Sequence, residues 1–173
     1  MRKYRTLMVA ATAFATLAMA VSLDCKQATA QDTDIAAAWI AAWNSHDPDA
    51  VLALFTDDAV YEDVTLGVVN HGSAELRAFA EGFFAAVPDV KFDLVNRSVS
   101  GGHGFIEWVS SGTDVGIFGT GKQISVRGAT IIDLQGDKIS RNSDYYDSAT
   151  ILREVGLLPP HDCTPSRIRS ARG

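Results

Sequence analysis

The stretch from Val51 to Asp63 constrains the fold of this 173-residue chain more than any other. An apolar helical run ends there, two aspartates turn the chain, and a short alternating strand from about Ala59 leads to Asp63. A carboxylate that ends a strand and faces an apolar enclosure is a typical arrangement for a general base in a small fold. We therefore expect any chemistry of this chain to centre on Asp63.

Apolar spacing predicts three helices followed by a run of strands. The helices are expected at 34–45, 47–55 and 73–87, the strands at 59–63, 90–99, 105–113, 124–134 and 138–146, and a closing helix at 147–155. Helices followed by an antiparallel meander are an α+β pattern. A curved antiparallel sheet wrapped over three N-terminal helices, with a short C-terminal helix, makes a cone whose inside is a pocket.

The N-terminus has the pattern of a signal peptide. Three basic residues precede an uncharged run from Leu7 to Val21, which is short for a membrane span. Small residues permit cleavage after Ala20 or after Ala30, and the polar start at Gln31 favours the second site. We expect residues 1–30 to be removed, with an uncleaved anchor as the alternative.

Export would leave one domain at 31–158, a mobile polar tail at 159–173, and no stable membrane span. The expected location is therefore periplasmic or secreted. The mature chain would carry 11 basic and 20 acidic residues, a net charge of −9, which argues against nucleic acid as a partner. Cys25 and Cys163 could form a disulfide only if cleavage occurs at the earlier site.

Three segments carry the pattern of a known superfamily: Trp43–Asp63, His71–Asp89 and Gly136–Leu157. They resemble the nuclear-transport-factor-2-like superfamily, whose cone-shaped fold ketosteroid isomerases and SnoaL-like polyketide cyclases share. The overall pattern is most similar to the SnoaL-like group. The resemblance covers residues 34–158 and implies the cone fold, but this fold hosts many unrelated activities.

In the ketosteroid isomerases the base is the aspartate that ends the first strand, which corresponds here to Asp63. The same resemblance aligns Trp39 with the tyrosine of their oxyanion hole and Thr130 with its protonated aspartate. Neither can play the same role, because an indole N–H is a weak acid and a threonine hydroxyl is a modest donor. The base therefore resembles that of the family, while the electrophilic half departs from it.

The last strand supplies the second candidate acid. Threading it on the cone fold turns Asp144 and Tyr146 inward, where Asp144 could form an acid/base pair with Asp63. The alternative is that Asp144 fixes Arg127 or Arg141. Both readings stay open at the level of the sequence.

Aromatic residues are expected to line the cone, together with a histidine in a loop over its mouth. The candidate ligand-binding residues are Trp39, Tyr61, His71, Phe83, Trp108 and Tyr146. A lining of this kind suits a flat, apolar, polycyclic or isoprenoid-like ligand. The histidines lack metal-type spacing, so we expect neither a metal nor another cofactor.

These expectations add up to an exported, SnoaL-like enzyme for small molecules. It would carry out cofactor-free acid/base chemistry (isomerisation, cyclisation or hydration) on a hydrophobic carbonyl compound. Asp63 would remove a proton next to the carbonyl, and Asp144 or Tyr146 would donate to the developing enolate. The alternatives are a non-catalytic protein that binds a hydrophobic ligand and an interaction module. A homodimer through the sheet face is expected in each case.

Overall fold

The computed structural model describes residues 28–160, with side chains described from residue 35 onward. Nothing in the structure tests removal of the expected signal peptide, and Cys25, Cys163 and nearly all of the expected tail lie outside the described residues. Within the described part, no helix is long and apolar enough to cross a membrane.

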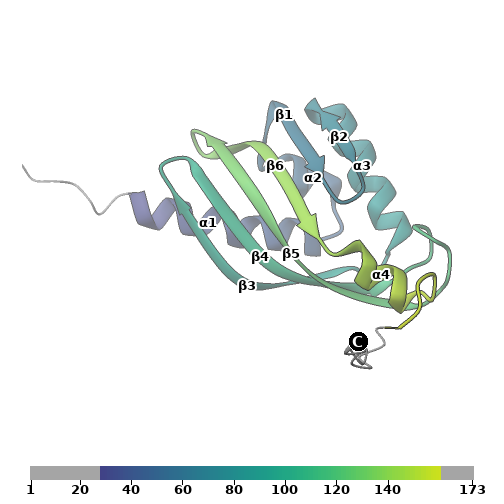
Figure 1. Cartoon of the computed structure of the whole chain (residues 1–173). Coiled ribbons are helices and arrows are strands. Elements are labelled where there is room, and N and C mark those ends of the chain that lie inside the picture. Colours follow the sequence, from purple (N-terminus) through teal and green to yellow (C-terminus); the bar gives the residue numbers. More distant parts are fainter. Residues whose placement is uncertain (1–27, 161–173) are drawn as a thin grey trace, which may run out of the picture.

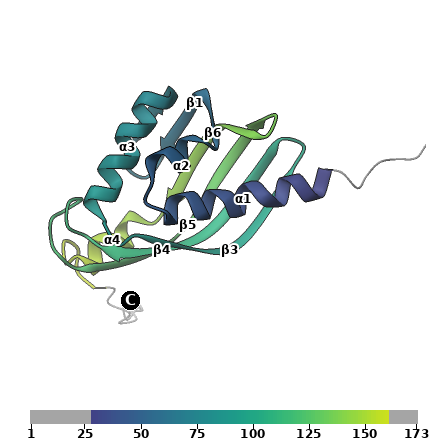
Figure 2. The ribbon, with the colours of Figure 1, turned by 180° about the vertical axis from the view of Figure 1, so that it is seen from behind.

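The described chain is an α+β fold, as the sequence predicts (Figure 1). Its elements are α1 (Ala28–Asn44), α2 (Pro48–Leu52), β1 (Phe55–Asp63), β2 (Val68–His71), α3 (Gly72–Ala86), β3 (Lys91–Ser100), β4 (His103–Thr113), β5 (Gln123–Gln135), β6 (Lys138–Tyr146) and α4 (Ser148–Glu154). The strands form one curved sheet, and α1, α2 and α3 lie on the same side of it (Figure 2). This side is the inside of the expected cone.

The sheet is mixed, whereas the sequence suggested an antiparallel one. Its strand order is β2-β1-β6-β5-β4-β3, and β1 pairs with β6 in parallel, while the other neighbours are antiparallel. Parallel neighbours need a long connection, and here the whole intervening domain supplies it. Strand β2 was not predicted, because it has only four residues and begins directly after the turn at Gly67.

Aspartate side chains cap two of the helices. Asp47 accepts a hydrogen bond from the backbone of α2, and Asp147 accepts one from that of α4. Helix α3 begins at Gly72, with His71 at the N-cap and no hydrogen bond from the His71 side chain. The carboxylate of Glu75 accepts the His71 backbone N–H at 2.7 Å, so a side chain within α3 satisfies the donor.

Aromatic side chains fill the space between the helices and the sheet. Trp39 and Trp43 of α1 are each 1% exposed. Trp39 stacks on Trp108 of β4 with ring centroids 6.5 Å apart, and Trp43 lies 5.7 Å from Tyr61 of β1. The two tryptophans are four residues apart and therefore lie on the same face of α1, which places both indoles in the core. Trp39 contacts β4, and Trp43 contacts β1.

Gly128 on β5 makes room for the indole of Trp108. A Cβ at this position would lie 2.7 Å from the Cζ2 and Cζ3 atoms of that ring, so the indole would have to move out of its stacking on Trp39. We expect Gly128→Ala to lower the free energy of unfolding by about 1–3 kcal/mol, measured by urea denaturation.

Gly82 in α3 is the matched control, because a Cβ there meets no atom within 4 Å. Gly82→Ala should raise the free energy of unfolding by about 0.4–1 kcal/mol, since alanine loses less entropy in a helix. Equal effects of the two substitutions would contradict the steric role assigned to Gly128.

Candidate functional site

The parallel pairing of β1 and β6 brings two acidic side chains together at the inner face of the sheet. In this register Asp63 lies opposite Asp144, and Tyr61 lies opposite Asn142. Thr130 of β5 continues the row on the other side of Asp144. Side chains that pair across neighbouring strands point to the same face, so these residues share one surface.

Asp144 is a buried carboxylate with three hydrogen-bond donors. The hydroxyl of Tyr61 donates to its Oδ2 atom, the Thr130 hydroxyl to Oδ1 at 2.6 Å, and the Asn142 amide to Oδ1 at 2.9 Å. All four side chains are buried. The sequence offered Arg127 or Arg141 as an alternative partner, but the guanidinium of Arg127 pairs with Glu107 and that of Arg141 with Glu62.

The indole N–H groups of Trp39 and Trp108 donate hydrogen bonds to two members of this network. The Trp39 N–H donates to the Asn142 amide oxygen at 3.0 Å, and the Trp108 N–H donates to the Thr130 hydroxyl at 2.9 Å. Trp39 and Thr130 are the positions that align with the oxyanion hole of the isomerases. Here they support Asp144, so they are not free donors for a ligand.

Asp63 has fewer partners than Asp144. Its Oδ2 atom accepts the Tyr146 hydroxyl at 2.9 Å, and its Oδ1 atom accepts the Leu66 backbone N–H at 2.8 Å. A carboxylate can accept about four hydrogen bonds, so each oxygen of Asp63 keeps capacity for a further proton or donor. Asp63 is 5% exposed and lies at the cavity wall.

Burial raises the pKa values of both acids. For Asp63, removal from water raises the pKa, while the hydrogen bonds from Leu66 and Tyr146 oppose the shift. For Asp144, burial raises the pKa from 3.8 to about 6, against its three donors and with a small contribution from the charge of Asp63. Burial and the adjacent carboxylates also raise the pKa values of Tyr61 and Tyr146, so both phenols stay protonated.

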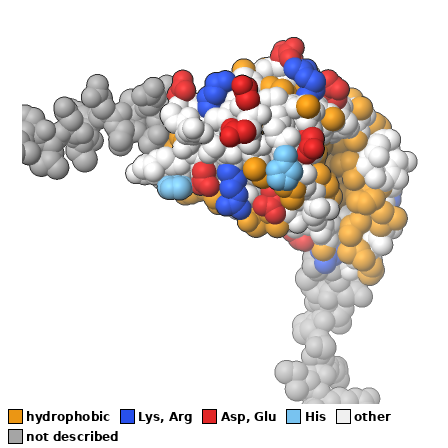
Figure 3. All heavy atoms as spheres, turned by 90° about the horizontal axis from the view of Figure 1, so that it is seen from above, with side chains coloured by type: hydrophobic (Ala, Val, Ile, Leu, Met, Phe, Trp, Pro, Cys, Tyr) orange, Lys and Arg blue, Asp and Glu red, His pale blue; other side chains and the backbone are white. Residues whose placement is uncertain are grey.

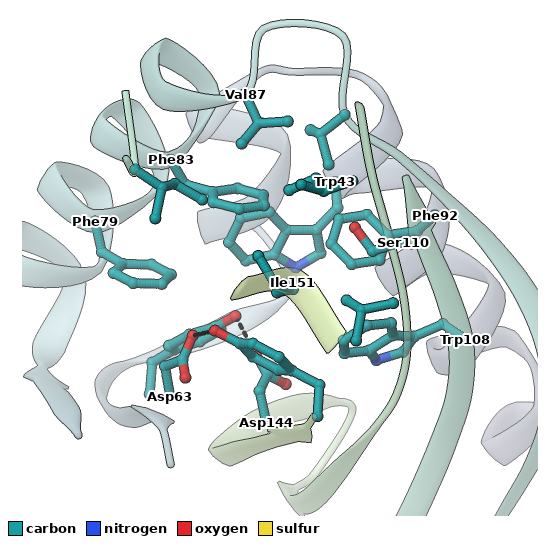
Figure 4. Close-up of a pocket in the computed structure, with 16 residues that line it drawn as sticks. Trp43, Asp63, Phe79, Phe83, Val87, Phe92, Trp108, Ser110, Asp144 and Ile151 are labelled. Atoms are coloured by element: carbon teal, nitrogen blue, oxygen red, sulfur yellow. Dashed lines mark hydrogen bonds between the residues drawn. The ribbon is translucent and has the colours of Figure 1, made fainter. Parts of the chain in front are cut away.

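Asp63 and Asp144 lie on the same side of an aromatic cavity of about 60 Å³, which Tyr146 also lines (Figure 4). The cavity is lined by Trp43, Tyr61, Asp63, Phe79, Phe83, Val87, Val90, Phe92, Trp108, Ser110, Ile117, Ile124, Val126, Asp144, Tyr146 and Ile151. Pockets for drug-sized ligands measure roughly 300–1,000 Å³. The volume therefore fits a compound of a few heavy atoms better than the polycyclic ligand suggested by the sequence.

Six of the eight expected site residues line this cavity: Tyr61, Asp63, Phe83, Trp108, Asp144 and Tyr146. Trp39 does not line it, because its indole packs behind the network of Asp144. His71 is exposed at the end of β2 and does not line it either. Sequence reasoning missed Trp43 and Phe92, although their spacing from Trp39 and from the following strand residues marks both as inward-facing.

A loop between β4 and β5 closes one side of the cavity with Ile117. The carboxylate of Asp114 accepts the backbone N–H groups of Phe118 and Thr120 and the Thr120 hydroxyl. Although burial opposes it, these hydrogen bonds lower the pKa of Asp114 to about 2. This loop is also hydrogen-bonded to the end of α3, where the carbonyl oxygen of Ala86 accepts the N–H of Val115 at 2.9 Å. The loop is thus fixed in place.

Among the described residues, no group of three or more His, Cys, Asp or Glu side chains is arranged to hold a metal ion.

A cone-shaped α+β domain with buried acids at its inner wall is typical of the nuclear-transport-factor-2-like class, and the fold expected from the sequence is confirmed. The SnoaL-like domain family matches residues 36–142, which is more than half of the chain. The chain therefore belongs to the SnoaL-like domain family. A comparison with curated proteins finds no match.

Solved structures show the same fold. A hypothetical protein with a ketosteroid isomerase-like fold from Catenulispora acidiphila, in complex with trimethylamine, is 28% identical, with 72% of this chain and 94% of that chain covered and a TM-score of 0.67. A candidate SnoaL-like polyketide cyclase from Jannaschia sp. CCS1 is 14% identical, with 77% and 96% covered and a TM-score of 0.67. An NTF2-like protein of unknown function from Burkholderia pseudomallei is 17% identical, with 73% and 98% covered and a TM-score of 0.64.

The raised pKa of Asp144 makes stability depend on pH. Between about pH 4 and pH 6 the folded chain holds a proton on Asp144 that the unfolded chain has lost. We therefore expect the free energy of unfolding to fall by roughly 3 kcal/mol as the pH rises through this range, and to level off above it. Urea denaturation at a series of pH values measures this slope.

Asp144→Asn should remove most of this slope, because the titrating group is gone. Asp114→Asn is the control: the pKa of Asp114 is about 2 in the folded chain, against 3.8 as the ordinary value, so its contribution to the pH dependence falls mainly below pH 4. A wild-type stability that rises between pH 4.5 and 7 would contradict the assignment.

Proposed function

We propose that this protein catalyses proton transfer next to the carbonyl group of a small apolar compound, with Asp63 as the general base. The observation that carries the proposal is the pairing of Asp63 with Asp144 on the wall of an aromatic cavity. Burial holds the pKa values of both acids above the ordinary range, toward those that suit proton transfer near neutral pH.

The proposed step transfers one proton. The Asp63 carboxylate takes a proton from the carbon next to the carbonyl, and the C–H electron pair forms the carbon–carbon double bond of an enolate. The negative charge moves to the carbonyl oxygen. Protonated Asp63 then returns its proton to another atom of the same compound, which completes an isomerisation or prepares a cyclisation.

Tyr146 and Asp144 assist Asp63 in different ways. The Tyr146 hydroxyl donates to Asp63 and fixes the carboxylate at the cavity wall. Asp144 accepts three hydrogen bonds and lies opposite Asp63, so it places a second carboxylate at the same wall. The charge of Asp63 contributes to the raised pKa of Asp144, because like charges disfavour ionisation.

Exchange of carbon-bound hydrogen in heavy water tests the base without knowledge of the natural substrate. We expect the wild type to accelerate deuterium incorporation next to the carbonyl of cyclopentanone, a small ketone with an otherwise hydrocarbon body. Asp63→Asn should lower this rate at least about 100-fold, because the amide cannot accept the proton. NMR of the ketone follows the exchange.

Asp93→Asn is the matched control, since Asp93 is exposed on β3 in an ion pair with Lys91. Its exchange rate should equal that of the wild type. Binding of cyclopentanone without any accelerated exchange would refute the catalytic proposal and favour the second candidate below.

The second candidate is a non-catalytic protein that binds a small ligand. Aromatic rings and two acids line the cavity, and such a surface attracts small ammonium ions as well as neutral compounds. The Catenulispora relative is in complex with trimethylamine. Under this alternative, trimethylammonium binds to the wild type, and Asp63→Asn weakens that binding without changing the affinity for cyclopentanone.

Export and a homodimer belong to the same proposal. The signal-peptide pattern of residues 1–30 supports a periplasmic or secreted location.

The outer face of the sheet exposes Ile131 and Tyr145, at 44% and 47%, which supports pairing with a second copy. On the face in Figure 3, acidic and basic side chains are interspersed without a continuous basic area, in keeping with a small-molecule function.

A further inference from the structure

Trp43 carries a buried hydrogen-bond donor that nothing in the described chain satisfies. The residue is 1% exposed, and its Nε1 atom has no acceptor among the described residues. The N–H groups of Trp39 and Trp108, in contrast, each donate to a side chain. Buried donors are nearly always paired in folded proteins, so an unpaired one in a cavity wall calls for an explanation.

Packing does not explain why this residue is a tryptophan. Rings surround the indole: Trp39, Tyr61, Phe79, Phe83, Phe84 and Phe92 all have centroids within 6.4 Å of it. A further hydrocarbon ring would fit such surroundings without an unpaired N–H group. The unpaired N–H group of Trp43 therefore indicates that a bound ligand supplies the hydrogen-bond acceptor.

The direction of the indole agrees with this reading. Trp43 lines the cavity together with both acids. Figure 4 shows its nitrogen on the edge of the ring that is turned toward the side of the cavity where Asp63 and Asp144 lie. An acceptor atom bound there would face the indole on one side and the proposed base on the other.

We propose that the Trp43 N–H group binds the carbonyl oxygen of the ligand. The inference rests on the proposed function in one respect, namely that the ligand is a carbonyl compound. The Trp43 N–H group would be the hydrogen-bond donor to the carbonyl oxygen. Trp39 and Thr130 cannot fill this role, because both already donate within the Asp144 network. An indole is too weak an acid to give up its proton, so Trp43 stabilises the enolate oxygen by hydrogen bonding alone.

The assignment also narrows the class of ligand. The rest of the cavity wall is mainly apolar, with Ser110 as a further hydroxyl on the side of Phe92. The ligand should therefore be a small ketone or aldehyde, with one carbonyl and an otherwise hydrocarbon body. A ligand without an acceptor would leave the indole N–H buried and unpaired, at a cost in affinity.

NMR of the indole N–H groups tests this directly in the wild type. The chain contains three tryptophans, so its ¹⁵N-labelled form gives three indole signals, which Trp→Phe variants assign. Cyclopentanone should move the Trp43 indole proton downfield, as expected for a new hydrogen bond. Methylenecyclopentane has the same shape but a CH₂ group in place of the oxygen, and should not produce this shift.

Affinity supplies a second readout. We expect the wild type to bind cyclopentanone about tenfold more tightly than methylenecyclopentane, and Trp43→Phe to abolish that preference while it still binds the hydrocarbon. Trp108→Phe is the matched control. It removes another indole of the cavity wall, but one whose N–H is already paired, so it should change both affinities by the same factor and keep the preference.

The outcomes separate this inference from the proposed catalysis. A Trp43 shift with cyclopentanone, but no accelerated deuterium exchange, would support the carbonyl contact and refute the base. Binding of both compounds with equal affinity and no selective shift of Trp43 would overturn the inference, whatever the exchange rate shows. If neither compound binds, the carbonyl ligand itself is refuted, and the inference fails with it.

Discussion

The burial of the Asp144 carboxylate is the constraint on which the rest of the structure depends. An unpaired buried charge would cost several kcal/mol, and three donors from β1, β5 and β6 reduce that cost. Those donors are correctly placed only when β1 lies beside β6 in the observed register. The network therefore fixes the one non-local parallel pairing of the sheet, and this pairing in turn puts Asp63 opposite Asp144.

Two buried acids show that burial alone does not decide the charge state. Asp114 and Asp144 each accept three hydrogen bonds, yet the pKa of Asp114 falls to about 2 and that of Asp144 rises to about 6. The donors to Asp114 include two backbone N–H groups of its own loop. Asp144 depends on side chains inside an apolar core and has Asp63 beside it. The first acid stabilises the loop as a carboxylate, and the second keeps a raised pKa beside Asp63.

The sequence predicted the fold and most of the cavity because those features are local or follow a family pattern. Strand alternation suffices to turn Asp63 and Asp144 inward, and helix spacing suffices to bury Trp39 and Trp43. The parallel pairing of β1 with β6 was not predictable from local patterns, since it joins segments about 80 residues apart. Strand β2 is too short to show a periodic pattern. The hydrogen bonds of Trp39 and Thr130 within the Asp144 network join residues of different elements, so the spacing of residues along the chain does not predict them.

The three tryptophans show how position in the fold divides the roles of one residue type. Trp39 and Trp43 are one helical turn apart, so the sequence treats them alike. Their surroundings in the fold differ. The Trp39 N–H donates to Asn142 of β6, whereas Trp43 packs on aromatic rings and lines the cavity. One indole donor is therefore used to hold the acid, and the other is left for what enters the pocket. A donor placed one turn further along α1 lines the same cavity as the two acids, so a tryptophan at position 39, where the resemblance to ketosteroid isomerases aligns a tyrosine, is compatible with the proposed function.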